Sequence, residues 1–131
     1  MSLQQQQRGS IIDGIAASAA EASRTAICNV ASADSIGFGI DLAWVAATAI
    51  TVQLFKSADG GVTYQRVPSL DISSGTGTAS DYTVSKGVSA TDTLWVDLGV
   101  GNATHVKIIV GATGGGATDL ITVKACSSSW S

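Results

Sequence analysis

Apolar and polar residues alternate along much of this chain, the period-2 pattern that is typical of β-strands with one buried face. In the clearest run, residues 36–45, the apolar positions are Ile36, Phe38, Ile40, Leu42 and Trp44. The alternation predicts eight short strands, at residues 24–31, 36–45, 48–56, 62–67, 81–85, 93–98, 105–110 and 120–126. No helical segment of ordinary length separates them. We therefore expect an all-β fold, an antiparallel β-sandwich of the jelly-roll or Greek-key type.

A tight turn joins the third and fourth predicted strands, in the segment Ser-Ala-Asp-Gly-Gly-Val-Thr-Tyr at 57–64. Gly60 and Gly61 accept a positive φ without a Cβ clash, while Ser57 and Asp59 are suited to bond the N–H groups of the turn. The segment resembles the Asp-box, a structural hairpin with the pattern Ser-x-Asp-x-Gly-x-Thr followed by an aromatic residue. It occurs once, so a propeller built of repeated blades is not expected.

The two ends of the chain lack this alternation. Residues 1–23 contain four consecutive glutamines and predict an extended N-terminal arm, which we expect to be removable without unfolding the rest. In this arm Ile11, Ile12 and Ile15 are suited to dock on an apolar partner. The predicted organisation is an arm at 1–23, one sandwich domain at 24–126 and a tail at 127–131.

Charge is scarce in the chain, and this narrows the classes of partner. Charged residues make up 13% of the 131 residues against 45% hydrophobic ones, and the net charge is −3. The seven basic residues are scattered, so direct nucleic-acid binding is not expected. No apolar run is long enough for a membrane span. A surface with so few charges suggests coverage by neighbours in an assembly.

Catalytic chemistry finds little support in the residue pattern. His105 is the one histidine, at the start of a predicted strand, and no second histidine or suitably spaced cysteine accompanies it. Asp71, Asp81 and Asp92 lie in loops that could converge, but aspartates in turns more often bond backbone donors. The glycine-rich segment 111–116 lacks the lysine of a phosphate loop. We expect no enzyme activity, cofactor or metal.

Two cysteines, Cys28 and Cys126, lie in the first and last predicted strands. These strands often come close in a sandwich, so a disulfide between them is one possibility. The N-terminus lacks the basic-then-apolar order of an export signal, and this favours two half-buried free thiols.

Two tryptophans are predicted to contact a partner. Trp95 has the opposite parity to Leu94, Val96 and Leu98, so it lies on the other face of its strand, exposed or in an interface. Trp130 lies in a serine-rich tail that an isolated fold does not require, and it is suited to anchor a partner.

The segment from Ile36 to Ala125 resembles small β-sandwich proteins of tailed bacteriophages. The resemblance is carried in order by the strand–turn–strand from Ile50 to Tyr64, by Thr93-Leu-Trp-Val-Asp-Leu98, and by two strands around the glycine-rich loop. Those last strands are His105-Val-Lys-Ile-Ile-Val110 and Leu120-Ile-Thr-Val-Lys-Ala125.

The resemblance is strongest to capsid decoration (cement) proteins. It implies a non-enzymatic virion structural protein that stabilises a phage capsid by bridging major capsid subunits. The partner is then the major capsid protein, the location is the capsid surface of a virion made in the host cytoplasm, and threefold positions of the shell suggest a homotrimer. The alternative is a carbohydrate- or receptor-binding module of a phage tail, which needs exposed aromatics near Tyr82, Trp95 or the 69–80 loop.

Overall fold

The computed structural model describes residues 3–67, 69–71, 78–80, 82–85 and 94–130. The strands in this part of the chain are β1 (Leu3–Ala16), β2 (Thr25–Asn29), β3 (Ser35–Leu42), β4 (Ala49–Ser57), β5 (Gln65–Val67), β6 (Ser69–Asp71), β7 (Thr78–Ser80), β8 (Tyr82–Ser85), β9 (Leu94–Gly99), β10 (His105–Thr113) and β11 (Leu120–Trp130). One short 3-10 helix, η1 (Glu21–Arg24), precedes β2. None of the described helical structure is long and apolar enough to cross a membrane.

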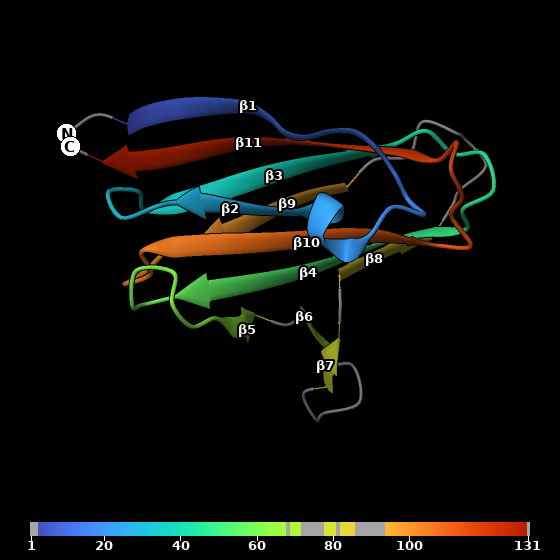
Figure 1. Cartoon of the computed structure of the whole chain (residues 1–131). Helices are drawn as coiled ribbons and strands as arrows, with labels where there is room; N and C mark the ends of the chain where they lie inside the picture. The colour runs from blue at the N-terminus through green and yellow to red at the C-terminus, as the bar shows by residue number, and fades with distance from the viewer. Residues whose placement is uncertain (1–2, 68, 72–77, 81, 86–93, 131) are drawn as a thin grey trace.

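The strands form two antiparallel layers, shown in Figure 1. Sheet A has the order β1-β11-β3-β9. Sheet B has the order β2-β10-β4-β5, and β8 also pairs with β4. Strands β6 and β7 pair with each other in a small separate ribbon. The predicted antiparallel β-sandwich is therefore confirmed.

The strand order is that of a jelly roll. When β1, β2, β3, β4, β8, β9, β10 and β11 are numbered one to eight along the chain, sheet A becomes 1-8-3-6 and sheet B becomes 2-7-4-5. These two four-stranded orders are those of a jelly roll, a double Greek key. This order brings the first and last strands side by side.

The core lies between the two sheets and comes from the alternating apolar positions. Fully buried side chains include Ile36, Phe38 and Ile40 of β3, Ile50, Val52 and Leu54 of β4, Val106, Ile108 and Val110 of β10, and Ile121 of β11. Burying each such side chain contributes roughly 1.5–3 kcal/mol. The period-2 pattern therefore identified the inner faces of the central strands correctly.

The N-terminal segment differs from the expected arm. Residues 3–16 are strand β1, paired with β11 from Leu3 opposite Trp130 to Ala16 opposite Leu120. Irregularities near Gly9 and Gly14, which have φ of 67° and 59°, bend β1 along β11. Ile12 is 3% exposed and belongs to the core. The sandwich therefore includes residues 3–16 of the predicted arm and residues 127–130 of the predicted tail.

The turn between β4 and β5 is held by side-chain hydrogen bonds. The Ser57 hydroxyl donates to Asp59 Oδ1 at 2.7 Å, and the N–H groups of Gly61 and Thr63 donate to Ser57 Oγ and Asp59 Oδ1, both at 2.9 Å. Gly60 and Gly61 have φ of 75° and 88°. Bonds from Thr63, its hydroxyl first, lower the pKa of the Asp59 carboxyl. Strand β5 begins only at Gln65, so the turn is longer than predicted.

Candidate functional site

The outer face of sheet A carries a hydrophobic side chain on a floor of small residues. Strand pairing aligns outward positions in two neighbouring rows, Gln7–Cys126–Gly37–Asp97 and Lys124–Gly39–Trp95. Inward neighbours such as Phe38 and Val96 belong to the core. Because the middle strand β3 has glycine in both rows, this face is open at its centre.

Trp95 lies across these two glycines. A Cβ atom on Gly37 would overlap indole Cζ2, so a larger residue there would displace the ring, while one on Gly39 would lie 3.0 Å from Cζ3, a tight contact. The indole Nε1–H donates to Asp97 Oδ1 at 2.9 Å. Trp95 is nevertheless 57% exposed. The ring is thus fixed from below and at its edge, while the side away from the sheet meets solvent.

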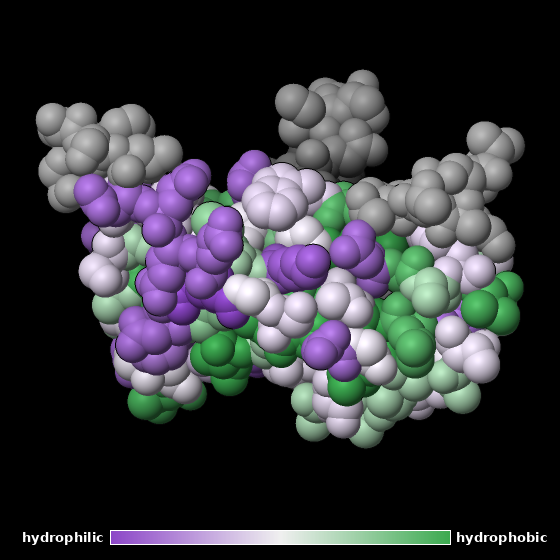
Figure 2. Space-filling view, turned by 90° about the horizontal axis from the view of Figure 1, so that it is seen from above, coloured by the Kyte–Doolittle hydropathy of each residue, from purple (hydrophilic) through white to green (hydrophobic). Residues whose placement is uncertain are grey.

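A groove of about 400 Å³ adjoins the indole. It is lined by Gln7, Gly9, Trp95, Lys124, Ala125 and Cys126. The lining combines one aromatic ring with an amide, an ammonium and a thiol. In the view from above in Figure 2, hydrophilic side chains gather toward the end of the molecule where both termini lie, and hydrophobic ones toward the other end.

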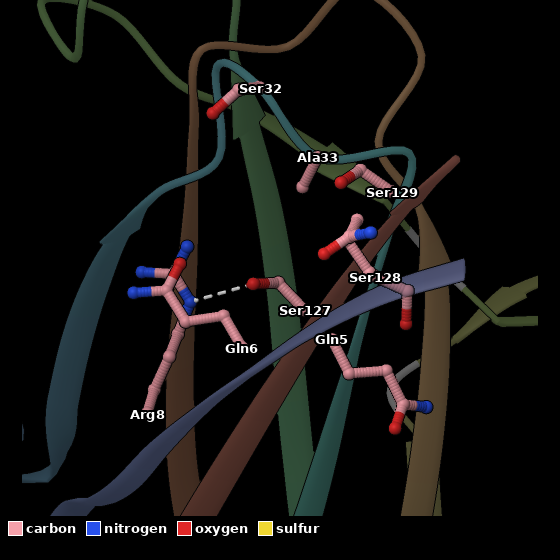
Figure 3. A pocket seen from close by; sticks show the side chains of 9 residues that line it. Gln5, Gln6, Arg8, Ser32, Ala33, Ser127, Ser128 and Ser129 are labelled. Carbon is pink, nitrogen blue, oxygen red and sulfur yellow. Dashed lines mark hydrogen bonds between the residues drawn. The ribbon is translucent and has the colours of Figure 1, made fainter. Parts of the chain in front are cut away.

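A second, polar pocket of about 170 Å³ lies at that end (Figure 3). It adjoins the paired segments Leu3–Gln7 and Cys126–Trp130, which we call the terminal ribbon. Its lining residues are Gln4, Gln5, Gln6, Arg8, Ser32, Ala33, Ser127, Ser128 and Ser129. Figure 3 shows Gln6, Arg8 and Ser127 on one side of the ribbon and Gln5 and Ser128 on the other.

Arg8 joins the two sheets beside this pocket. Its Nε donates to Ser127 Oγ at 3.3 Å, and its terminal nitrogen donates to the Asn29 carbonyl of β2 at 2.8 Å. A guanidinium used in this way fastens the edge of sheet A to the edge of sheet B. The terminal ribbon is therefore held in place at its inner end.

The isoleucines predicted to dock on a partner have structural positions instead. Ile12 is in the core, and Ile11 and Ile15 are partly buried against it. This corrects the sequence-based interpretation of Ile12 as a docking residue, because β1 uses it to cover the interlayer space. Of the two predicted tryptophans, Trp95 is exposed as expected. Trp130 lies in β11 opposite Leu3, and its side chain is outside the described part.

The cysteines are free thiols rather than a disulfide. Cys28 is buried in β2, and burial raises the pKa of its thiol, an effect that nearby Arg8 partly offsets. Cys126 is half-buried and lines the groove beside Trp95. The two thiols therefore differ in access to solvent.

Among the described residues, no three His, Cys, Asp or Glu side chains form a group that could hold a metal ion. His105 is half-buried, and its Nδ1 lies 3.0 Å from the Thr104 hydroxyl. Asp81 and Asp92 of the considered carboxylate group lie outside the described residues, as do the side chains of Asp71, Tyr82 and the 69–80 loop.

Sequence reasoning missed Asp119, a fully buried carboxylate in the turn before β11. Its Oδ1 accepts the N–H groups of Val45, Ala46 and Ala47 at 2.7–3.0 Å, and its Oδ2 accepts that of Gly116 at 2.8 Å. These bonds, with Ala47 first and Gly116 next, lower the pKa of the carboxyl. Asp119 joins two loops at one end of the sandwich, a structural role.

No family model matches this sequence, and a search of curated proteins finds no match. Among solved structures, the fold is similar to the PBSX exported protein XepA, with a TM-score of 0.52, 12% identity, and coverage of 98% of this chain and 38% of that chain. A non-crystalline cellulose-specific carbohydrate-binding module, CBM28, gives a TM-score of 0.44 at 10% identity, covering 92% and 71%. The pili of Bacillus endospore appendages give a TM-score of 0.47 at 18% identity, covering 97% of this chain and 86% of that chain. At these identities the likeness concerns the fold alone.

Proposed function

We propose that this chain is a non-enzymatic virion structural protein that decorates and stabilises a phage capsid by bridging major capsid subunits. The terminal ribbon is the observation that carries the proposal. It combines an edge strand with neutral polar side chains at an end of the molecule that a neighbouring subunit can reach. The phage resemblance of the sequence supports the same role.

An edge strand is a ready contact for another protein. Within the described chain, β1 forms the edge of sheet A, with β11 as its neighbour. From Leu3 to Gln7 its pairing is regular, and neither this segment nor Cys126–Trp130 contains a charged residue. Edge strands that avoid pairing usually carry charges or bulges, and β1 has bulges only beyond Gln7. Leu3–Gln7 is therefore suited to strand addition by a capsid subunit.

Bridging stabilises a shell by mass action, because the protein binds assembled subunits and not separated ones. A rigid sandwich can hold two neighbouring subunits at a fixed distance, and this role needs no catalysis. Low surface charge suits lasting burial between neighbours. Three copies around a threefold position of the shell are the proposed arrangement.

The test is attachment of the purified chain to phage shells that lack it. A variant with Gln5→Lys and Gln6→Lys places two charges on the ribbon edge and should attach at least about tenfold more weakly, since charges on an edge strand oppose strand addition. The matched control, Asn102→Lys with Ala117→Lys, adds the same charge at exposed loop residues and should attach normally. Equal attachment by both variants would remove the ribbon from the mechanism.

A second candidate is a carbohydrate- or receptor-binding module of a phage tail. The specific observation in its favour is Trp95, an exposed indole held flat against Gly37 and Gly39 beside a polar-rimmed groove. Attachment to tails rather than shells, together with glycan binding, would favour this candidate.

A further inference from the structure

We infer that the groove beside Trp95 binds one pyranose ring of a glycan, with the apolar C–H face of the sugar stacked on the exposed side of the indole. The inference rests on the second candidate function, to which it assigns a ligand class and residues. The groove meets the terminal ribbon only at Gln7 and Cys126, so the Gln5 and Gln6 variants test capsid attachment separately from sugar binding.

The indole is already in a binding orientation before a ligand arrives. Gly37 and Gly39 support the ring from below, and the 2.9 Å bond to Asp97 fixes its rotation. A side chain that is held in this way loses little conformational freedom on binding, so more of the contact energy remains as affinity. An exposed tryptophan without such support would instead turn to cover its own apolar surface.

Polar side chains line the groove beside the indole and can bond sugar hydroxyls. Strand β11 lies two strands from β9, about 10 Å away at roughly 4.8 Å per strand, and the indole covers the strand between them. Lys124 and Cys126 therefore stand at the edge of the ring, with Gln7 on the next strand. The Lys124 ammonium donates to hydroxyls, and the Gln7 amide both donates and accepts.

The lining combines a mostly apolar surface, to which the indole contributes, with a few polar groups, and this combination suits a sugar that stacks by one apolar face. One aromatic face with a polar rim matches a pyranose, which has an apolar face and a ring of hydroxyls. The groove volume of about 400 Å³ is in the range of small-ligand sites.

The test uses the full chain, first on an array of immobilised glycans and then in NMR titrations with methyl glycosides of the sugars that bind. Sugar binding should move the indole N–H signal of Trp95, identified by its loss in Trp95→Phe. Trp95→Ala should weaken binding at least about tenfold, and Trp95→Phe should weaken it less because a smaller ring remains. Val62→Ala, at an 80% exposed position on the β4–β5 turn, should bind as the wild type does.

Two further variants test whether Gly37, which lies beneath the indole, is needed for sugar binding. Gly37→Ala should displace the indole and weaken sugar binding, whereas Gly99→Ala, whose added Cβ meets no atom within 4 Å, should leave it unchanged. Bound sugar should also slow alkylation of Cys126, while buried Cys28 stays unreactive with or without sugar.

Absence of binding to every glycan on the array would overturn the inference, and so would binding that Trp95→Ala leaves intact. Shell attachment is measured separately in the same variants. Normal attachment without sugar binding contradicts this inference alone, and sugar binding without attachment contradicts capsid decoration alone.

Discussion

At the scale of single residues, parity along a strand decides which side chains meet solvent. Trp95 differs in parity from Leu94, Val96 and Leu98, and its exposure of 57% follows the pattern. The position of two β3 glycines beneath the Trp95 ring was not predictable, because it depends on which strand lies next to β9. Gly37 and Gly39 look like ordinary polar-side positions of β3 until the pairing with Asp97 and Trp95 is known.

Asp119 gives a prediction at this scale. Asp119→Ala removes the acceptor of four backbone N–H groups, so we expect the melting temperature at about pH 7 to fall by at least about 5 °C. The exposed Asp41, changed to alanine, is the control and should have little effect.

The same pair tests the pH dependence. Because folding lowers the pKa of Asp119, its contribution to stability is complete above the ordinary aspartate pKa of about 3.9 and is lost as the pH falls through the lower folded value. The difference between wild type and Asp119→Ala should therefore shrink on acidification below about pH 4. A difference that grows in acid would contradict this assignment.

At the scale of elements, strands with clear alternation of apolar and polar residues were predicted correctly, and strand β1, in which the alternation is weak, was not. Strands β3 and β4 lie within a residue or three of their predicted limits, since one face of each is buried throughout. Strand β1 was missed for two physical reasons. Its glutamines have little intrinsic strand preference, and its bulges shift the apolar residues out of period 2. Its partner β11 is also the most distant strand in the chain.

Because strand β1 places Ile12 in the core, shortening this side chain should destabilise the fold. Ile12→Ala should cost about 2–5 kcal/mol of unfolding free energy, because Ile12 is 3% exposed. The control Ile27→Ala, in the edge strand β2 and 56% exposed, should cost about 0.5 kcal/mol or less. Denaturant unfolding gives both values.

Equal effects of the two isoleucine variants would mean that β1 does not cover the core. Deletion of residues 1–23, which the sequence suggested would leave the sandwich folded, is expected to destabilise the sandwich strongly. It removes a whole strand and uncovers β11.

At the scale of the whole molecule, the predicted number of sandwich strands was right while their identity was partly wrong. The eight jelly-roll strands include β1 and exclude β5, which is a short continuation of the hairpin. The order that places β1 beside β11 also puts both termini at one end, and this forms the terminal ribbon.

The most direct test of capsid decoration is the number of copies of this chain in purified phage particles, measured by quantitative mass spectrometry against the major capsid protein. Capsid decoration predicts that the copies of this chain are in a fixed ratio to those of the major capsid protein and are similar to them in number. Absence from the particles, or a few copies confined to the tail, would contradict it.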